Sequence, residues 1–441
     1  MYKNVICNKK YLLYLLVFIS FVILCLNYMT DFTHIANYHW FSTWQNDSDS
    51  IIAGRAYVIK HFGLLYNNFL LPVGFEQGNF DINTLSTYTS QFGLAGNILG
   101  LILNLPFGIT FAHFILCASF CAVLFYIIKW IYEEIGVFAA IGAYSMAFIS
   151  KWLIVSVRDI YWIVFIFILP FAISLYFLKK EENTKKSFLG LWGIANFCVI
   201  AFKALSGFEG ITVILINSVL PIFYYAFKNK WQWRKLLVTL FTIGLSGLCS
   251  FIFAVLCHLV QLYYYFNYDW NKALTLFNND IARRTAATTY SGQIPEAYLA
   301  SLESSKWYVL NLYLTSGGGI IFGFRMYIVL IIYTIAALIS MSQNKLRMII
   351  NLSLYFFSIT ISINQEKIRA LSDTQRKLYS FAILNTLSLL GPISWYILAS
   401  PHSFIHTHIN YIYWSLPSLI LIGAFVFYVI ELCIKVQIKK V

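Results

Sequence analysis

Residues 109–128 read ITFAHFILCASFCAVLFYII, twenty positions without Asp, Glu, Lys or Arg. A helix of about 20 apolar residues matches the hydrocarbon thickness of a bilayer, since each residue adds about 1.5 Å to the helix. Similar runs recur from one end of the 441-residue chain to the other. They are too long and too continuously apolar for the alternating strands of a membrane barrel, so we expect transmembrane helices.

The composition supports an integral membrane protein. The chain is 60% hydrophobic and 11% charged, whereas about 25% of the residues in a soluble domain are charged. The net charge of +13 comes from short basic clusters between apolar runs. That arrangement follows the positive-inside rule, and it indicates no nucleic-acid partner. Seven of the eight cysteines lie in or beside apolar runs, without zinc-type spacing, so we interpret them as embedded hydrophobes.

The basic clusters predict the topology. Lys3, Lys9 and Lys10 precede the first apolar run, which places the N-terminus in the cytoplasm and makes that run an uncleaved span. Two larger outer loops are expected, at residues 30–108 and 267–319, in a single membrane domain covering residues 1–441. We expect crossings at residues 11–28, 109–128, 137–155, 161–178, 188–202, 211–227, 236–265, 320–341, 381–400 and 411–434.

Two apolar segments are less simple. Gly93–Pro106 is short and contains two asparagines, so it fits an interfacial helix of the first outer loop better than a crossing. Met348–Ile363 either crosses the membrane, which gives eleven spans, or lies at its surface, which gives ten. Ten spans leave both termini in the cytoplasm, and the positive-inside rule favours that count. The sequence therefore predicts an all-α, polytopic protein of about ten helices.

Ionisable side chains gather on the expected outer side of the membrane. Each costs about 2.5–3.5 kcal/mol near the bilayer centre, so their placement is informative. The pair Asp47 and Asp49, one residue apart after the first span, can act as a general base, as ligands of a divalent cation, or as both. An ordinary solvated turn is the plainer interpretation of such a pair. The outer-side set is Asp47, Asp49, Arg55, Arg158, Asp159, Lys203, Glu209, Arg283 and Arg284.

The cations of this set suit an anionic headgroup. Arg158 and Lys203 occupy very short outer turns, which keeps their charges at the membrane surface, where a lipid phosphate lies. Taken singly, each is equally well explained as a snorkelling anchor. Several cations on the same side favour a functional interpretation.

Three histidines, His402, His406 and His408, fall within seven residues of the last outer loop. On a helix His402 and His406 share a face, a spacing that metal ligands use. No glutamate of the HExxH type accompanies them. Contact with substrate or headgroup, and hydrogen-bonded helix caps, are the two stronger interpretations.

The layout resembles the bacterial GT-C-type integral membrane glycosyltransferases. It has a first span, a large outer loop that opens with acidic residues, and paired spans joined by tight turns with basic residues. The stretches that carry the resemblance are Tyr88–Leu94 with Gln91, Arg158–Trp162 with Tyr161, Lys203–Glu209, Arg284–Thr285, and Ser394–Asn410. The resemblance covers nearly the whole chain as an architecture with short motifs.

The resemblance implies transfer of a sugar from a polyprenyl-phosphate donor to a glycan or lipid-linked acceptor, on the outer face of a bacterial inner membrane. A catalytic carboxylate in the first outer loop would be Asp47 or Asp49. The donor phosphate would meet Arg158, Lys203 or Arg284. The full set of residues expected to contact substrate is Gln91, Arg158, Tyr161, Lys203, Glu209, Arg283, Arg284, His402, His406 and His408. The chain is shorter than many members and lacks their C-terminal soluble domain, so acceptor recognition would fall to the two outer loops. By its size and architecture, we expect the chain to fall among the members that decorate O-antigen lipopolysaccharide, teichoic acid or similar surface glycans.

Two other functions compete with transfer. An O-antigen polymerase would depend on the outer-loop arginines Arg158, Arg283 and Arg284 more than on the acidic pair. A polysaccharide or lipid transporter (flippase) would place its ionisable groups near the middle of the membrane and often shows two similar halves, which this sequence does not.

Overall fold

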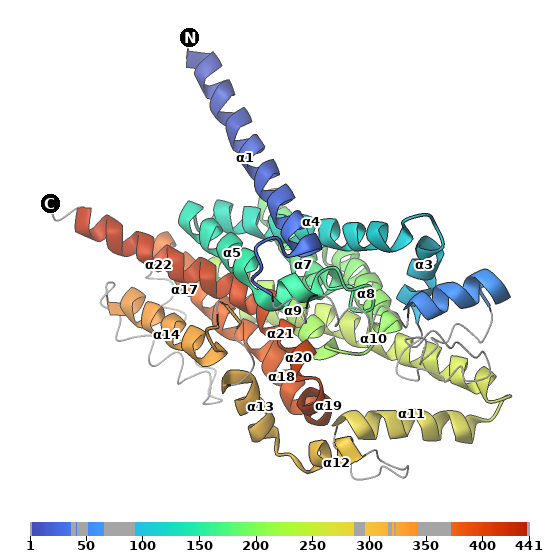
Figure 1. Ribbon diagram of the computed structural model, residues 1–441. Coiled ribbons are helices and arrows are strands. Elements are labelled where there is room, and N and C mark those ends of the chain that lie inside the picture. The colour runs from blue at the N-terminus through green and yellow to red at the C-terminus, as the bar shows by residue number, and fades with distance from the viewer. Residues whose placement is uncertain are drawn as a thin grey trace.

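The computed structural model describes residues 2–36, 41, 52–65, 93–285, 296–315, 320–321, 323–342 and 372–438. Within these ranges the chain is helical and contains no strand, only isolated bridges that join Ile321 to Ser150 and Phe324 (Figure 1). Three expected site residues, Asp47, Asp49 and Gln91, lie outside the described residues, as does Met348–Ile363.

From α3 to α11 and from α17 to α22, the helices of the described chain follow one another with short connections. Their bounds are α1 Tyr2–Thr30, α3 Leu94–Leu103, α4 Gly108–Glu134, α5 Val137–Ile149, α6 Lys151–Ser156, α7 Phe165–Thr184, α8 Leu189–Ser206, α9 Ile211–Lys228, α10 Trp233–Tyr265, α11 Trp270–Thr285, α12 Glu296–Glu303, α13 Lys306–Thr315, α14 Met326–Ser342, α17 Asp373–Ser388, α18 Leu390–Leu398, α19 Ser400–Ile405, α20 Thr407–Asn410, α21 Ile412–Trp414, the π-helical turn η4 Ser415–Leu419, and α22 Ile420–Ile438. A further helix covers residues 52–62.

Six helical segments of the described chain are long and apolar enough to cross a membrane. Three shorter apolar helices, Tyr14–Thr30, Val137–Ile149 and Met326–Ser340, accompany them. The described chain is therefore all-helical with helices fit to cross a membrane, as the sequence predicts, whereas the expected count of ten crossings is not confirmed. The six segments are Gly108–Glu134, Leu189–Ser206, Ile211–Lys228, Trp233–Tyr265, Asp373–Leu398 and Ile412–Lys435.

Two expected crossings are interrupted by non-helical backbone. The run 137–155 breaks at Ser150, which is extended, and the run 411–434 breaks at Leu416. The two breaks meet, because the hydroxyl groups of Ser150 and Ser415 share a hydrogen bond of 3.0 Å. The carbonyl oxygen of Leu416 accepts a hydrogen bond from the side-chain amide of Asn217 at 3.3 Å. Irregular backbone inside an apolar bundle is tolerated where protein buries it and supplies its hydrogen-bond partners, as Asn217 does here.

Close packing of small residues joins α5 to α22. A Cβ atom added at Gly142 would lie 2.3 Å from the carbonyl oxygen of Gly423, so neither position has room for a side chain. Close contacts of this kind hold membrane helices together, because lipid is as apolar as the helix surfaces and the hydrophobic effect does not drive their association. Elsewhere α9 packs against α7, α10, α17 and α18, which places it at the centre of the bundle.

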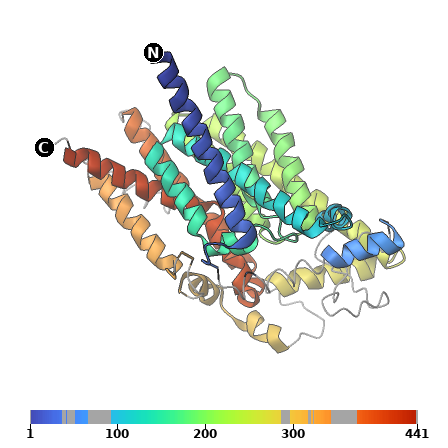
Figure 2. The same cartoon turned by 45° about the horizontal axis from the view of Figure 1, so that its top comes forward.

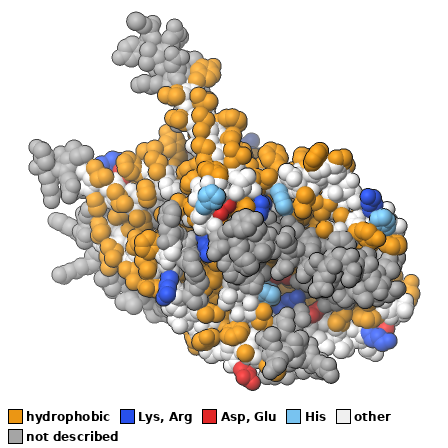
Figure 3. All heavy atoms as spheres, in the orientation of Figure 1, with side chains coloured by type: hydrophobic (Ala, Val, Ile, Leu, Met, Phe, Trp, Pro, Cys, Tyr) orange, Lys and Arg blue, Asp and Glu red, His pale blue; other side chains and the backbone are white. Residues whose placement is uncertain are grey.

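The exterior of the bundle is apolar. Figure 3 shows a face dominated by hydrophobic side chains, with few charged groups among the described residues. Large exposed hydrophobic side chains are frequent on α1, α4, α10 and α14, for example Phe241 on α10, which is 70% exposed. An apolar surface of this extent needs a partner, and a bilayer is the partner that fits helices of this length.

The bundle has two distinct ends. Figure 2 shows the long helices running side by side, with both chain termini at one end and α11 and α12 at the other. We call the first the basic end, and it holds Lys228. The connection between α4 and α5 meets α22 there, since a Cβ atom added at Gly136 would lie 3.7 Å from a carboxylate oxygen of Glu431. We call the other the site end: there the guanidinium of Arg158 donates to the carbonyl oxygen of Met29.

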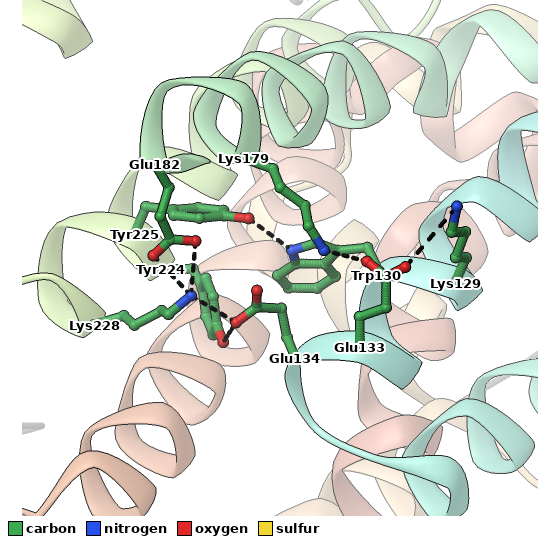
Figure 4. Close-up of polar contacts among 9 residues, drawn as sticks. All are labelled: Lys129, Trp130, Glu133, Glu134, Lys179, Glu182, Tyr224, Tyr225 and Lys228. Atoms are coloured by element: carbon green, nitrogen blue, oxygen red, sulfur yellow. Dashed lines mark hydrogen bonds and ion pairs between the residues drawn. The ribbon is translucent and has the colours of Figure 1, made fainter. Parts of the chain in front are cut away.

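An ion cluster at the basic end ties three helices together (Figure 4). The ammonium group of Lys228 on α9 lies 2.7 Å from the Glu134 carboxylate of α4 and 3.0 Å from the Glu182 carboxylate of α7. The hydroxyl group of Tyr224 donates to Glu134 at 3.1 Å. The Lys228 and Glu134 side chains are only 13% and 7% exposed, so each charge depends on the other for solvation.

Replacing Lys228 by methionine should lower thermal stability markedly, because it leaves two carboxylates without their cation. Breaking a buried pair costs about 3–5 kcal/mol. The matched control is Lys129→Met, which removes an exposed lysine 3.9 Å from Glu133. A surface pair contributes about 0–1 kcal/mol, so the control should melt close to wild type. Equal melting temperatures of the two variants in detergent would contradict the role of the cluster.

Candidate functional site

The candidate site lies at the site end, where two turns join α6 to α7 and α8 to α9. In the first turn the carboxylate of Asp159 accepts a hydrogen bond from the backbone N–H of Trp162 at 2.9 Å. An aspartate that bonds the backbone a few residues ahead stabilises a turn. Asp159 therefore shapes the segment that carries Tyr161 and Trp162 toward the second turn.

Lys203 is buried in the last turn of α8. Its ammonium group donates to the carbonyl oxygen of Gly207 at 3.1 Å and lies 5.2 Å from the ring centre of Phe167. A cation at this position satisfies a terminal carbonyl and opposes the negative end of the helix dipole. The ammonium has three N–H donors, and this carbonyl uses one of them.

Glu209 is buried at the beginning of α9. The hydroxyl group of Tyr161 donates to one of its carboxylate oxygens at 3.2 Å. The carboxylate also attracts the Lys203 ammonium, although no ion pair within 4 Å joins these two described residues. The N-terminus of α9 favours a negative charge at this position. Tyr161, Lys203 and Glu209, all three expected from the sequence to contact substrate, are thus brought together.

Gly210 fixes how α9 begins. Its φ angle is +67°, a left-handed conformation that L side chains rarely adopt. A Cβ atom there would lie 2.6 Å from ring atoms of both Phe167 and Tyr413. Because Gly210 has no side chain, the Tyr413 ring packs directly against its backbone, one residue after Glu209.

Arg158 is held against the end of α1. Its guanidinium donates to the carbonyl oxygens of Met29 at 3.0 Å and Phe41 at 2.7 Å, and it stacks 3.6 Å from the Phe41 ring centre. The first expected outer loop is thereby joined to the α6–α7 turn. Arg158 shares the site end with Lys203 and Glu209 and anchors this loop.

Arg55 is a second buried cation of the first outer loop. It donates to the side-chain carbonyl of Asn97 at 2.7 Å and joins the helix at residues 52–62 to α3. Burial lowers the pKa of its guanidinium to about 10. These contacts make Arg55 part of the packing of the first outer loop.

The histidines lie in and beside α19. The ring centres of His402 and His406 are 4.6 Å apart, and His402 packs edge-on against Trp395 at 5.9 Å. Within the described chain, no group of three or more His, Cys, Asp and Glu side chains could hold a metal ion. α19 also packs against α11, α12 and α13, and the Tyr313 hydroxyl of α13 donates to the carbonyl oxygen of Ser403. Burial raises the pKa of Tyr313, so it stays protonated as a donor.

Arg284 belongs to the neighbouring helix α11. Its guanidinium lies 3.5 Å from the Asp280 carboxylate and donates to the Asp280 carbonyl oxygen at 3.2 Å. Because α11 packs against α19, Arg284 and the histidines share one layer at the site end. The side chains of Arg283 and His408 lie outside the described set.

Sequence reasoning missed the aromatic surroundings of Glu209. From the sequence, Trp162 and Trp395 fit the interfacial belt of a membrane protein, and nothing distinguishes Tyr413. The Trp162 and Trp395 rings each meet the Tyr413 ring edge-to-face, at 6.2 Å and 5.9 Å between ring centres. These residues come from distant parts of the chain, and no spacing in the sequence indicates that they meet.

No protein-family model matches this chain, and no curated protein and no solved structure is significantly similar to it.

Replacing Gly210 by alanine should disturb the candidate site. The left-handed φ and the blocked Cβ position together should cost about 2–4 kcal/mol of stability. The control is Gly193→Ala on α8, because a Cβ there meets nothing within 4 Å and alanine favours the helix. Thermal unfolding in detergent compares the two variants. A Gly210→Ala protein as stable as Gly193→Ala would show that the Tyr413 contact with α9 is unimportant.

Proposed function

We propose that this protein is a membrane-embedded glycosyltransferase, which moves a sugar from a polyprenyl-phosphate donor to a glycan or lipid-linked acceptor. The observation that carries the proposal is a buried carboxylate, Glu209, close to a buried ammonium, Lys203, at one end of an otherwise apolar bundle. Ionisable groups inside a membrane protein are costly and commonly mark substrate sites.

The chemistry needs a cation and a base. The acceptor oxygen attacks the sugar carbon that carries the phosphate, the bond from that carbon to the phosphate oxygen breaks, and the hydroxyl proton passes to a carboxylate. Lys203 and Arg284 are suited to bind the departing phosphate and to stabilise its negative charge. In this proposal Asp47 or Asp49 accepts the proton, and the pair is also suited to hold a divalent cation.

The arrangement of the ends supports an outward-facing site. Both termini lie at the basic end (Figure 2), and the connection between α7 and α8, with Lys185 and Lys186, begins beside Glu182 of the ion cluster there. The positive-inside rule assigns such an end to the cytoplasm. The site end would then face outward from a bacterial inner membrane, and an even number of crossings, ten in our topology, would join the two termini on one side.

The direct test is the chemical structure of the cell-surface glycan. Deleting the protein should remove one sugar substituent, and wild type should restore it. The double variant Asp47→Asn/Asp49→Asn and the variant Lys203→Met should each reduce that sugar about 100-fold, because each loses a group that acts in the transition state. Lys272→Met, an exposed lysine on α11, is the matched control and should restore the sugar fully.

Other outcomes would assign a different function. A change in glycan chain length with unchanged sugars would indicate polymerisation in place of transfer. That activity would depend on Arg158 and Arg284. A lipid-linked glycan that accumulates unmodified would indicate transport. Full modification by the double aspartate variant would contradict the assigned base.

A further inference from the structure

Four buried polar atoms near Glu209 have no hydrogen-bond partner among the described residues. They are the second carboxylate oxygen of Glu209, the hydroxyl oxygen of Tyr413, and the indole nitrogens of Trp162 and Trp395. Burying such atoms unpaired costs free energy, and nearly all buried polar groups in folded proteins are paired. Four in one place therefore need an explanation.

These four side chains form one cluster around Tyr413. The Tyr413 ring lies against Gly210, the residue after Glu209. Trp162 and Trp395 meet the same ring edge-to-face from two other segments. Tyr161 completes the cluster, since it packs against Trp162 at 6.0 Å and donates to the other oxygen of Glu209.

The chemistry of the cluster selects its ligand. A carboxylate oxygen accepts hydroxyl hydrogens, an indole N–H donates, and a tyrosine hydroxyl does both. Rings surround these groups and offer apolar contact area. A sugar ring carries hydroxyl groups that donate and accept, together with C–H bonds that pack against aromatic rings. A phosphate would be repelled by Glu209, and Lys203, beside Phe167, is the group that suits it.

We propose that Glu209, Tyr413, Trp162 and Trp395 form a subsite for the hydroxyl groups of a sugar ring. This inference rests on the proposed transfer function, because the sugar bound here would be the one carried by the donor. Lys203 meets the phosphate while the subsite holds the attached ring. His402, which is partly exposed, packs on Trp395 at the edge of this cluster.

The variant Tyr413→Phe tests the subsite without disturbing the fold. It keeps the ring and removes only a hydroxyl group that bonds none of the described residues, so the melting temperature should stay the same or rise. Tyr396→Phe is the matched control. Its hydroxyl donates to the Asn410 carbonyl oxygen at 2.8 Å, so this variant should melt at a lower temperature and bind the sugar as wild type does.

Calorimetry of the full chain in nanodiscs measures binding of farnesyl phosphate and of farnesyl phosphate linked to glucose, galactose, mannose or N-acetylglucosamine. Wild type should bind at least one sugar-bearing probe more tightly than farnesyl phosphate. Tyr413→Phe and Glu209→Gln should each reduce the preference for that probe over farnesyl phosphate about tenfold, because each loses one hydrogen bond to a sugar hydroxyl. Tyr413→Phe, which changes no charge, should leave the affinity for farnesyl phosphate itself unchanged.

Two results would overturn the subsite: no preference of wild type for any sugar-bearing probe, or unchanged preference in both variants. The surface-glycan analysis separates this failure from failure of the transfer function. If deletion changes the glycan but calorimetry shows no sugar preference, the transfer function stands and the subsite is wrong. If deletion leaves the glycan unchanged but Tyr413→Phe abolishes a sugar preference, the subsite stands and the transfer function is wrong.

Discussion

The structure depends on one constraint: hydrocarbon supplies no hydrogen-bond partner, so polar groups within the bundle must find partners in protein. Helices solve this for most of the backbone. Where helices break, protein groups supply backbone partners: the Asn217 amide donates to the Leu416 carbonyl oxygen, and the Lys151 N–H beside Ser150 donates to the Ile320 carbonyl oxygen. Charged groups of the described chain are mostly confined to the two ends, where the ion cluster and the Lys203–Glu209 site bring opposite charges together.

Helix α9 connects these two ends. Glu209 and Gly210 immediately precede its first residue at the site end. Asn217 near its middle donates to the broken backbone at Leu416, and Lys228 at its last position belongs to the ion cluster. Since α7, α10, α17 and α18 surround it, the position of the Glu209 carboxylate is set by packing along the whole helix. Rigid placement of this kind is what a binding or catalytic group requires.

The sequence predicted the helices better than their interruptions. Apolar length alone identified the segments that became α4, α8, α9 and α10, because hydropathy reports transfer into lipid. It could not indicate the break at Ser150, which depends on a contact with Ser415 far along the chain. Lys203, Glu209 and Tyr161 could be anticipated because two short turns at the same end of the bundle carry them. Tyr413 could not, since its place arises from tertiary packing.

In the proposed orientation, the end holding Lys203 and Glu209 faces outward while the end holding Lys228 faces the cytoplasm. Single cysteines at Lys272 on α11 and at Lys186 between α7 and α8, both exposed, report the two sides to a membrane-impermeant maleimide in intact cells. The account predicts labelling of Lys272→Cys in intact cells and of Lys186→Cys only after permeabilisation. The opposite pattern, or labelling of both in intact cells, would contradict it.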